Sequence, residues 1–282
     1  MKRFRIILIL LLPLCLCTES CGQGENRYVA YFKDTPAYNL AKAIKKNDLE
    51  KVEILIKQDS TLLQLTEPEF GNSVLALAVN VESFESFEKL LELGADANSM
   101  NPFTNYSVLM TSIRPFGSSL EWRDDNRYAE LLLQNGADPE YAVEKFFIGE
   151  KRRVWPDSPL MKASRSNLEM VKILIKYGAD PFRKLGQEQQ TPFGAALSRS
   201  RYDIIYYFID TLEVDIHQPL SIRNKDSLFI QDYIVKKKIL AKIRAREVNG
   251  KDIQITKESW ELIKYLESKG VDFVNYEYKR LK

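Results

Sequence analysis

The sequence predicts an all-α solenoid, in which pairs of helices joined by short turns stack side by side along one axis. Three observations predict it. The tripeptide Gly-Ala-Asp recurs after apolar runs, a motif led by Ser or Thr recurs before them, and one loop length joins unit to unit. Such units bury a continuous core only against their neighbours. We expect about five to six repeats, with degenerate first and last copies and two insertions.

The second helix of each unit is marked by apolar spacing and by the glycine that follows. Large apolar residues lie at i, i+3 and i+4 or adjacent positions in four runs, at residues 87–93, 128–133, 170–175 and 262–266. This spacing places them on one buried stripe of a helix. The glycine after each run takes the left-handed conformation that ends a helix without a Cβ penalty. These glycines are Gly94, Gly136, Gly178 and Gly270.

The first helix of each unit begins after a hydroxyl residue that accepts a backbone N–H, and a proline in the next position is tolerated there. The hydroxyl residues are Ser73, Ser107, Ser158 and Thr191. Five positions on, a small residue lets the neighbouring helix approach closely; these residues are Ala78, Ser112, Ala163 and Ala196. The steps from Asp96 to Ser107 and from Asp180 to Thr191 are both 11 residues, so one loop length joins successive units.

These residues resemble the ankyrin repeat, whose pattern runs Thr-Pro-Leu-His-x-Ala, a turn, a Leu-rich helix and Gly-Ala-Asp. The resemblance implies a helix–turn–helix unit of about 33 residues with a projecting loop. It covers nearly all of the chain after residue 36 and gives one ankyrin-repeat domain at residues 37–282. Within this domain we expect a degenerate first repeat at 37–70, clear repeats at 71–103, 104–140, 156–188 and 189–220, and a C-terminal cap at 221–282.

The chain departs from the family pattern in two ways. The family's histidine is absent, replaced by Ala76, Met110, Met161 and Gly194. Its usual polar link between repeats therefore cannot form, and we expect packing to substitute for it. Successive glycines at 94, 136 and 178 are also 42 residues apart, more than the repeat length of about 33. The excess places one insertion at about 114–126 and another at about 139–156.

A basic start and a short apolar run predict an export signal at residues 1–20. Lys2, Arg3 and Arg5 precede apolar residues 6–16, a run too short for a bilayer core, which takes about 20 helical residues. All cysteines of the chain lie in or beside this segment, at Cys15, Cys17 and Cys21.

The end of the signal is predicted to carry a lipid at Cys21. Residues 18–21, Thr-Glu-Ser-Cys, resemble a bacterial lipobox, although Thr18 stands where leucine is usual. Ordinary cleavage beside Ser20 would leave Cys21 as a free thiol, which is a liability in an oxidising compartment. Residues 21–36 are then a tether or linker. We expect an exported protein, lipid-anchored to a membrane in the cell envelope; the alternative is a soluble periplasmic or secreted protein.

Charge argues against a nucleic-acid partner. The net charge is +2, and removal of residues 1–20 takes away three of the 41 basic and one of the 39 acidic residues, which leaves 38 of each. A neutral protein has no global electrostatic attraction to nucleic acid or an anionic bilayer. Basic residues crowd a predicted helix at 232–248, either as a face for an acidic partner or lipid headgroups or, as we favour, as the solvated side of the cap.

The sequence indicates no catalytic residue, cofactor site or metal site. His217 is the only histidine and lies in a predicted loop. After Cys21 the chain has no cysteine and a single histidine, too few for the Cys and His ligands of a zinc site, and no phosphate-binding glycine loop follows a strand. Asp124 and Asp125 are adjacent acids in an insertion. The recurring Asp96, Asp138, Asp180 and Asp272 are expected to hold turns through side-chain to backbone hydrogen bonds.

The predicted function is therefore non-enzymatic binding of an unidentified protein by a monomer, in a scaffold, inhibitor or immunity-type role. Binding energy comes mainly from a few aromatic or arginine anchors, and the insertions carry them. The predicted partner-binding residues are Phe116, Trp122, Arg152, Arg153 and Trp155. Alternatively the insertion aromatics cover a misfit between repeats, as we favour for Phe146 and Phe147. The other function considered is a carboxylate-dependent hydrolase, which requires a cleft with converging carboxylates.

Overall fold

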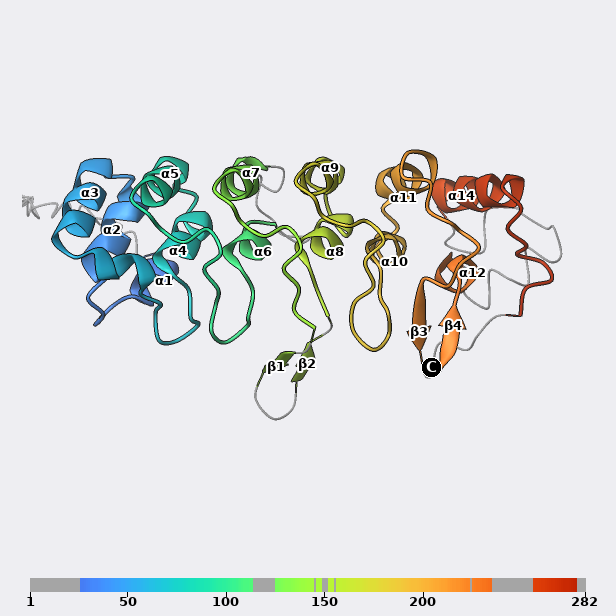
Figure 1. The fold of residues 1–282 in the computed structure, drawn as a ribbon, viewed down its shortest axis with the longest axis horizontal. Helices are drawn as coiled ribbons and strands as arrows, with labels where there is room; N and C mark the ends of the chain where they lie inside the picture. The colour runs from blue at the N-terminus through green and yellow to red at the C-terminus, as the bar shows by residue number, and fades with distance from the viewer. Residues whose placement is uncertain are drawn as a thin grey trace, which may run out of the picture.

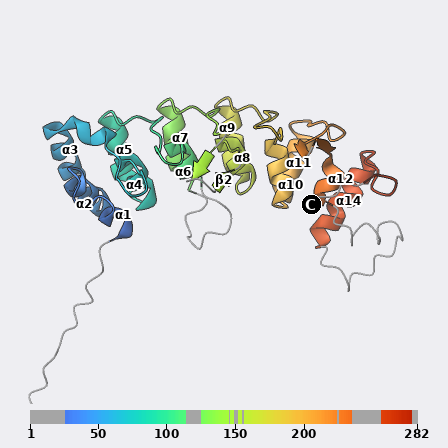
Figure 2. The same ribbon diagram turned by 90° about the horizontal axis from the view of Figure 1, so that it is seen from below.

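The computed structural model describes residues 26–113, 125–144, 146–148, 152–154, 156–223, 225–234 and 256–277. These residues are mostly helical, and the helices form an elongated row of pairs (Figures 1 and 2). In chain order the elements are α1 (Arg27–Ala30), α2 (Tyr38–Lys46), α3 (Leu49–Gln58), the 3-10 helix η1 (Ser60–Gln64), α4 (Val74–Asn80), α5 (Phe84–Glu92), α6 (Val108–Ser112), α7 (Arg127–Gln134), β1 (Phe146–Ile148), β2 (Arg152–Val154), α8 (Pro159–Ser164), α9 (Leu168–Lys176), α10 (Pro192–Ser198), α11 (Tyr202–Asp210), β3 (Ser221–Arg223), β4 (Asp226–Leu228), α12 (Ile230–Ile234) and α14 (Lys257–Ser268).

The helix pairs stack in two layers, as the sequence predicts. Figure 1 shows α3, α5, α7, α9, α11 and α14 along one layer, and α2, α4, α6, α8, α10 and α12 beneath them. Leu90, Leu132 and Leu174 occupy equivalent places in three successive helices of the upper layer, and each is fully buried in one continuous hydrophobic cluster. The apolar stripes of neighbouring units therefore shelter one another, which is the arrangement that defines a solenoid.

Local capping chemistry fixes where four helices of the lower layer begin, α4, α6, α8 and α10. Ser73, Ser107, Ser158 and Thr191 each accept a hydrogen bond from the backbone N–H three residues on, as predicted. The proline that follows two of them lies in the first turn of α8 and α10. The small residues Ala78, Ala163 and Ala196 are fully buried, where neighbouring helices pack closely.

Glycine follows four helices of the upper layer, α5, α7, α9 and α14. The φ angles of Gly94, Gly136, Gly178 and Gly270 are +95°, +82°, +100° and +87°, in the left-handed region that the sequence predicts. After Gly178, the N–H of Ala179 donates to the carbonyl of Leu174 at 2.9 Å, which closes the end of α9. The backbone conformation that this closure needs is easy for glycine and strained for other residues.

We therefore expect Gly178→Val to destabilise the protein by about 1–2 kcal/mol, because a β-branched residue is strained at positive φ. A Cβ at this position meets no atom within 4 Å, so the loss isolates backbone strain. Gly178→Asn is the control, since asparagine tolerates this region better. Urea unfolding followed by circular dichroism measures both variants. An unchanged midpoint for the valine variant would contradict the assignment of this helix end.

The folded part of the chain begins earlier than the sequence analysis places it. Residues 26–36 were predicted to belong to the tether. In the structure they form α1 and the turns after it. Val29 is buried and Phe32 is fully buried in the main core. Helix α1 packs against α2 and α4, so these residues cover the apolar end of the stack. The predicted tether is thus wrong from residue 26 on.

Two short hairpins interrupt the helical pattern. Strands β1 and β2 pair antiparallel in the insertion before α8, and β3 and β4 pair antiparallel after α11. At the C-terminal end, α14 buries Leu262, Ile263 and Leu266 against the core. The predicted basic helix at 232–248 lies mostly outside the described residues, which contain only α12 of that region.

In the part of the chain that the structure describes, the helices are all too short or too polar to span a bilayer.

Candidate interaction surface

Most residues predicted to bind a partner lie outside the described part of the chain. This holds for Phe116, Trp122 and Trp155, and for Cys21. The backbones of Arg152 and Arg153 are described: they lie in β2, opposite Ile148 and Phe147. The structure therefore places these arginines on a hairpin, and their role in binding stays a prediction.

The loops that join successive units project from one side of the stack. The base of each loop is closed by an isolated β-bridge. The bridges join Thr66 to Ser73, Met100 to Ser107, Val143 to Asp157, and Leu185 to Gln190. Figure 1 shows these loops below both helix layers, and the third of them extends into β1 and β2. A surface formed by several units is thus available along the loop side.

Large apolar side chains are exposed on two of these loops and in the turn after α9. Phe70 is 46% exposed, Phe103 is 51% exposed and Phe182 is 49% exposed, and Met100 is exposed in the same loop as Phe103. They are not among the residues predicted from the sequence to bind a partner. The signal present in the sequence is an aromatic residue three or four positions before a capping serine, as Phe70 precedes Ser73 and Phe103 precedes Ser107. Exposed aromatics at loop tips are typical anchors for a protein partner.

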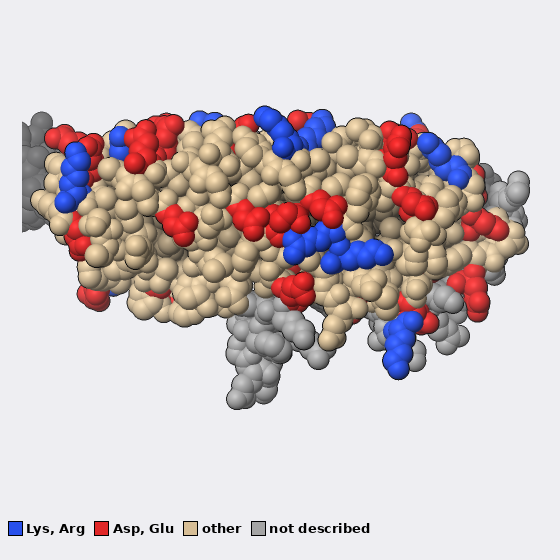
Figure 3. Space-filling view, in the orientation of Figure 1, with Lys and Arg blue, Asp and Glu red and all other residues tan. Residues whose placement is uncertain are grey.

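Acidic side chains mark the turn after each helix of the upper layer. The side chains of Asp96, Asp138, Asp180 and Asp272 each accept a hydrogen bond from the backbone N–H two residues on, at 2.8 Å in every case. The prediction that they hold turns is confirmed. Figure 3 shows a row of acidic groups across the middle of the visible face, with basic groups gathered below its centre. The visible face thus has a negative stripe.

Polar side chains also join successive turns. Asn98 accepts from the N–H of Asp138 at 2.8 Å and donates to the carbonyl of Gly136 at 2.9 Å. At the equivalent position of the next unit, Glu140 accepts from the N–H of Asp180 at 2.7 Å and pairs with Arg183 at 2.9 Å. Successive units are therefore joined by polar groups as well as by packing, which is expected to replace the family histidine. Links at the turns supplement that packing.

A buried ion pair lies where the long third loop meets α8. Asp157 is largely buried and receives two hydrogen bonds from Arg165, at 2.9 and 3.0 Å. Its neighbour Tyr106 comes from the preceding loop, with its hydroxyl 3.4 Å from the carboxylate. Burial, together with the negative charge of Asp157, raises the pKa of Tyr106 to about 12. These three side chains connect the second loop to the third, and this arrangement indicates a structural role.

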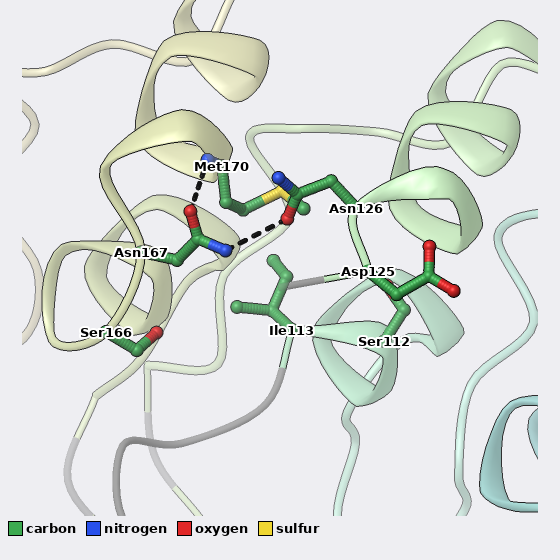
Figure 4. A pocket seen from close by; sticks show the side chains of 7 residues that line it. All are labelled: Ser112, Ile113, Asp125, Asn126, Ser166, Asn167 and Met170. Carbon is green, nitrogen blue, oxygen red and sulfur yellow. Dashed lines mark hydrogen bonds between the residues drawn. The ribbon is translucent and has the colours of Figure 1, made fainter. Parts of the chain in front are cut away.

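A shallow hollow lies between α6 and α7 on one side and α8 and α9 on the other (Figure 4). The space that it encloses is about 200 Å³, and part of this space is open to solvent. Asn167 donates to Asn126 at 3.0 Å across it. Among the described lining residues the only carboxylate is Asp125. It pairs with Arg127 and points away from the asparagines in Figure 4. The hydrogen bonds from Arg127 lower the pKa of Asp125.

The hollow does not have the geometry that a carboxylate-dependent hydrolase requires, which is two acids directed at one point. His217 lies exposed in the turn after α11, where its backbone N–H donates to Asp215 at 2.9 Å. Across the described ranges, no three His, Cys, Asp or Glu residues gather as metal ligands do.

Comparison with known proteins gives one finding. Residues 160–209, which contain α8 to α11, match the family model described as ankyrin repeats in many copies. No curated protein matches the chain significantly. The matched segment contains the capping residue Thr191 and the turn at Gly178. Together with the row of stacked helix pairs, this match supports an ankyrin repeat protein.

Proposed function

We propose that this chain is a non-enzymatic protein-interaction module, which binds its partner through the concave face and the projecting loops. Ankyrin repeats generally mediate protein–protein interaction. The observation that carries the proposal is the exposure of Phe70 and Phe103 on two of the bridged loops, together with that of Phe182 in the turn after α9. The hydrolase alternative is not favoured, because the described hollow contains a single carboxylate that is already paired.

We also propose the location and the role. Residues 1–20 act as an export signal, and Cys21 carries a lipid that anchors a monomeric chain to a membrane of the cell envelope. The support is the basic start, the short apolar run and the restriction of cysteine to this segment. Anchored there, the chain holds or inhibits an exported protein, in a scaffold or immunity-type role.

Capture from the envelope of the producing cell tests the binding function. The full chain with an affinity tag is cross-linked in cells and purified, and recovered proteins are retested as purified pairs by isothermal titration. We expect one partner with saturable binding. Recovery of no protein, combined with turnover of a substrate in a hydrolase screen, would replace this proposal with the enzymatic alternative.

Metabolic labelling with a lipid precursor tests the anchor. We expect the wild type to be labelled and Cys21→Ser to lose the label completely, because the thiol is the site of attachment. Cys17→Ser is the matched control: it lies in the segment that is removed, so its label should persist. Equal labelling of the wild type and Cys21→Ser would reject lipidation at this position and place the lipid elsewhere, whereas a wild type without label would favour a soluble exported protein.

A further inference from the structure

Two adjacent loop tips bring four apolar residues together. Gly71 has a φ of +73°, and a Cβ there would lie 3.0 Å from Pro102 and 3.2 Å from Phe103. The loop at 100–107 therefore lies directly against the loop at 66–73. On the other side, the ring of Tyr31 packs on Phe70 with centroids 4.5 Å apart. We call Tyr31, Phe70, Pro102 and Phe103 the aromatic tip surface.

Buried and bridging polar groups hold the first of these tips. Glu67 is 1% exposed, although it is a carboxylate. Its oxygens accept from the backbone N–H groups of Glu69, Phe70 and Asn72 at 2.8 to 2.9 Å, and from the side-chain amide of Asn72 at 2.7 Å. These bonds fix the backbone on both sides of Phe70.

Asn101 fixes the second tip and joins it to the first. Its side-chain oxygen accepts from the N–H groups of Phe103 and Thr104, at 3.0 and 2.9 Å. Its amide donates to the carbonyl of Phe70 at 2.7 Å. The exposed rings therefore stand on a rigid frame. A rigid frame loses little conformational entropy when a partner binds, which is the advantage of a preorganised surface.

Along the chain, the charges that flank Phe70 and Phe103 are acidic. Between Lys57 and Lys89, and again from residue 90 to residue 113, the chain has no lysine or arginine. The same stretches carry the exposed acids Glu69 and Asp96. Lys33, on the segment that carries Tyr31, is the nearest cation along the chain. An acidic surround favours a partner of positive charge.

Phe182 is flanked by other charges along the chain, with Asp180 before it and Arg183, which pairs with Glu140, after it. Phe182 is as exposed as Phe70, but Arg183 and Lys184 follow it directly. An exposed phenylalanine is thus presented in two charge environments, which supplies an internal control.

We propose that the aromatic tip surface docks a segment of another protein in which lysine or arginine stands beside apolar side chains. The inference rests on the proposed protein-binding function and names the chemistry of the partner. The apolar side chains of the segment cover Phe70 and Phe103. Its cations lie near Glu69 and Asp96 or over the exposed ring faces, where attraction to the aromatic quadrupole favours them.

Selection from a phage-displayed library of random peptides, with the full chain as the target, tests the proposal. We expect enrichment of peptides that combine basic and apolar residues. A synthetic peptide of the enriched sequence then binds the Phe70→Ala/Phe103→Ala variant roughly tenfold or more weakly, because central aromatic anchors dominate binding. Phe182→Ala, the matched control, keeps the wild-type affinity.

A charge variant separates the two parts of the recognition. Glu69→Lys leaves the rings in place and is expected to weaken the peptide several-fold at low salt, with the difference shrinking as salt rises. Both sets of substitutions are on exposed side chains, and thermal unfolding of each variant confirms that the fold is retained.

The outcomes distinguish this inference from the proposed function. Enriched peptides that are acidic, or that bind the double variant normally, overturn the tip surface and leave a protein-binding module. Self-association of the wild type that the double variant abolishes makes a second copy the occupant and overturns the basic partner. If no peptide is enriched, the inference fails, and capture from the envelope alone decides the proposed function.

Discussion

Replacing Phe87 with alanine is expected to lower the free energy of unfolding by about 3–5 kcal/mol, the range for removal of a large aromatic side chain from a core. Phe87 is fully buried in α5. Its ring centroid lies 5.0 Å from that of Tyr128 in α7, in an edge-on arrangement. The substitution therefore leaves a cavity between two successive helices of the upper layer and also removes an aromatic pair, which adds to area burial.

Urea unfolding monitored by far-ultraviolet circular dichroism measures this loss. Phe182→Ala is the matched control, because the same truncation at a half-exposed ring is expected to change stability by less than about 0.5 kcal/mol. Each unit of a stacked array contacts only its neighbours, so weakening the contact of α5 with α7 is expected to broaden or split the transition. A loss below about 1 kcal/mol would show that the two helices do not depend on this contact.

The repeat architecture was predictable because its signals are local. A serine or threonine that caps a helix, an apolar stripe and a glycine at its end act within one turn of chain. Ser158 and Gly178 do in the structure what their positions in the sequence indicate. The aspartates after each helix behave likewise, since an Asp that holds the N–H two residues on needs no distant partner.

Features that depend on distant contacts were not predictable in the same way. Val29 and Phe32 make too short a pattern to indicate a buried segment, and their burial follows from packing against α2 and α4. The link from Asn98 to the next turn joins residues 40 positions apart. The apolar periodicity of a single repeat predicts neither the burial of residues 29 and 32 nor this link between turns.

The candidate site shows the same division. Aromatic and arginine residues are dense in the insertions, and the predicted anchors therefore lie there. The exposed rings of Phe70 and Phe103 belong instead to short loops of ordinary composition. Their exposure follows from Glu67 and Asn101, whose hydrogen bonds set the loop backbone. Composition predicts which segments are rich in aromatic residues, whereas the exposure of each ring depends on the geometry of the loop backbone.

The junction between the long third loop and the following loop is expected to be as sensitive as the core. Gly186 has a φ of +66°, and a Cβ there would lie 2.3 Å from Cγ of Pro156, far inside contact distance. The adjacent Leu185 is buried and hydrogen-bonds with Gln190 in both directions, which limits how far the loop moves away. We expect Gly186→Ala to destabilise the protein by about 2–4 kcal/mol, because overpacking adds to backbone strain.

Gly136→Ala separates these two contributions. Gly136 also has a positive φ, +82°, but a Cβ at that position meets no atom within 4 Å. Its loss of stability, about 1–2 kcal/mol, therefore reports strain alone. Adding Pro156→Ala to Gly186→Ala removes the Cγ and should restore most of the excess loss if the clash causes it. Equal losses for the two glycine variants, with no recovery in the double variant, would mean that the loops at Pro156 and Gly186 are not in contact in solution.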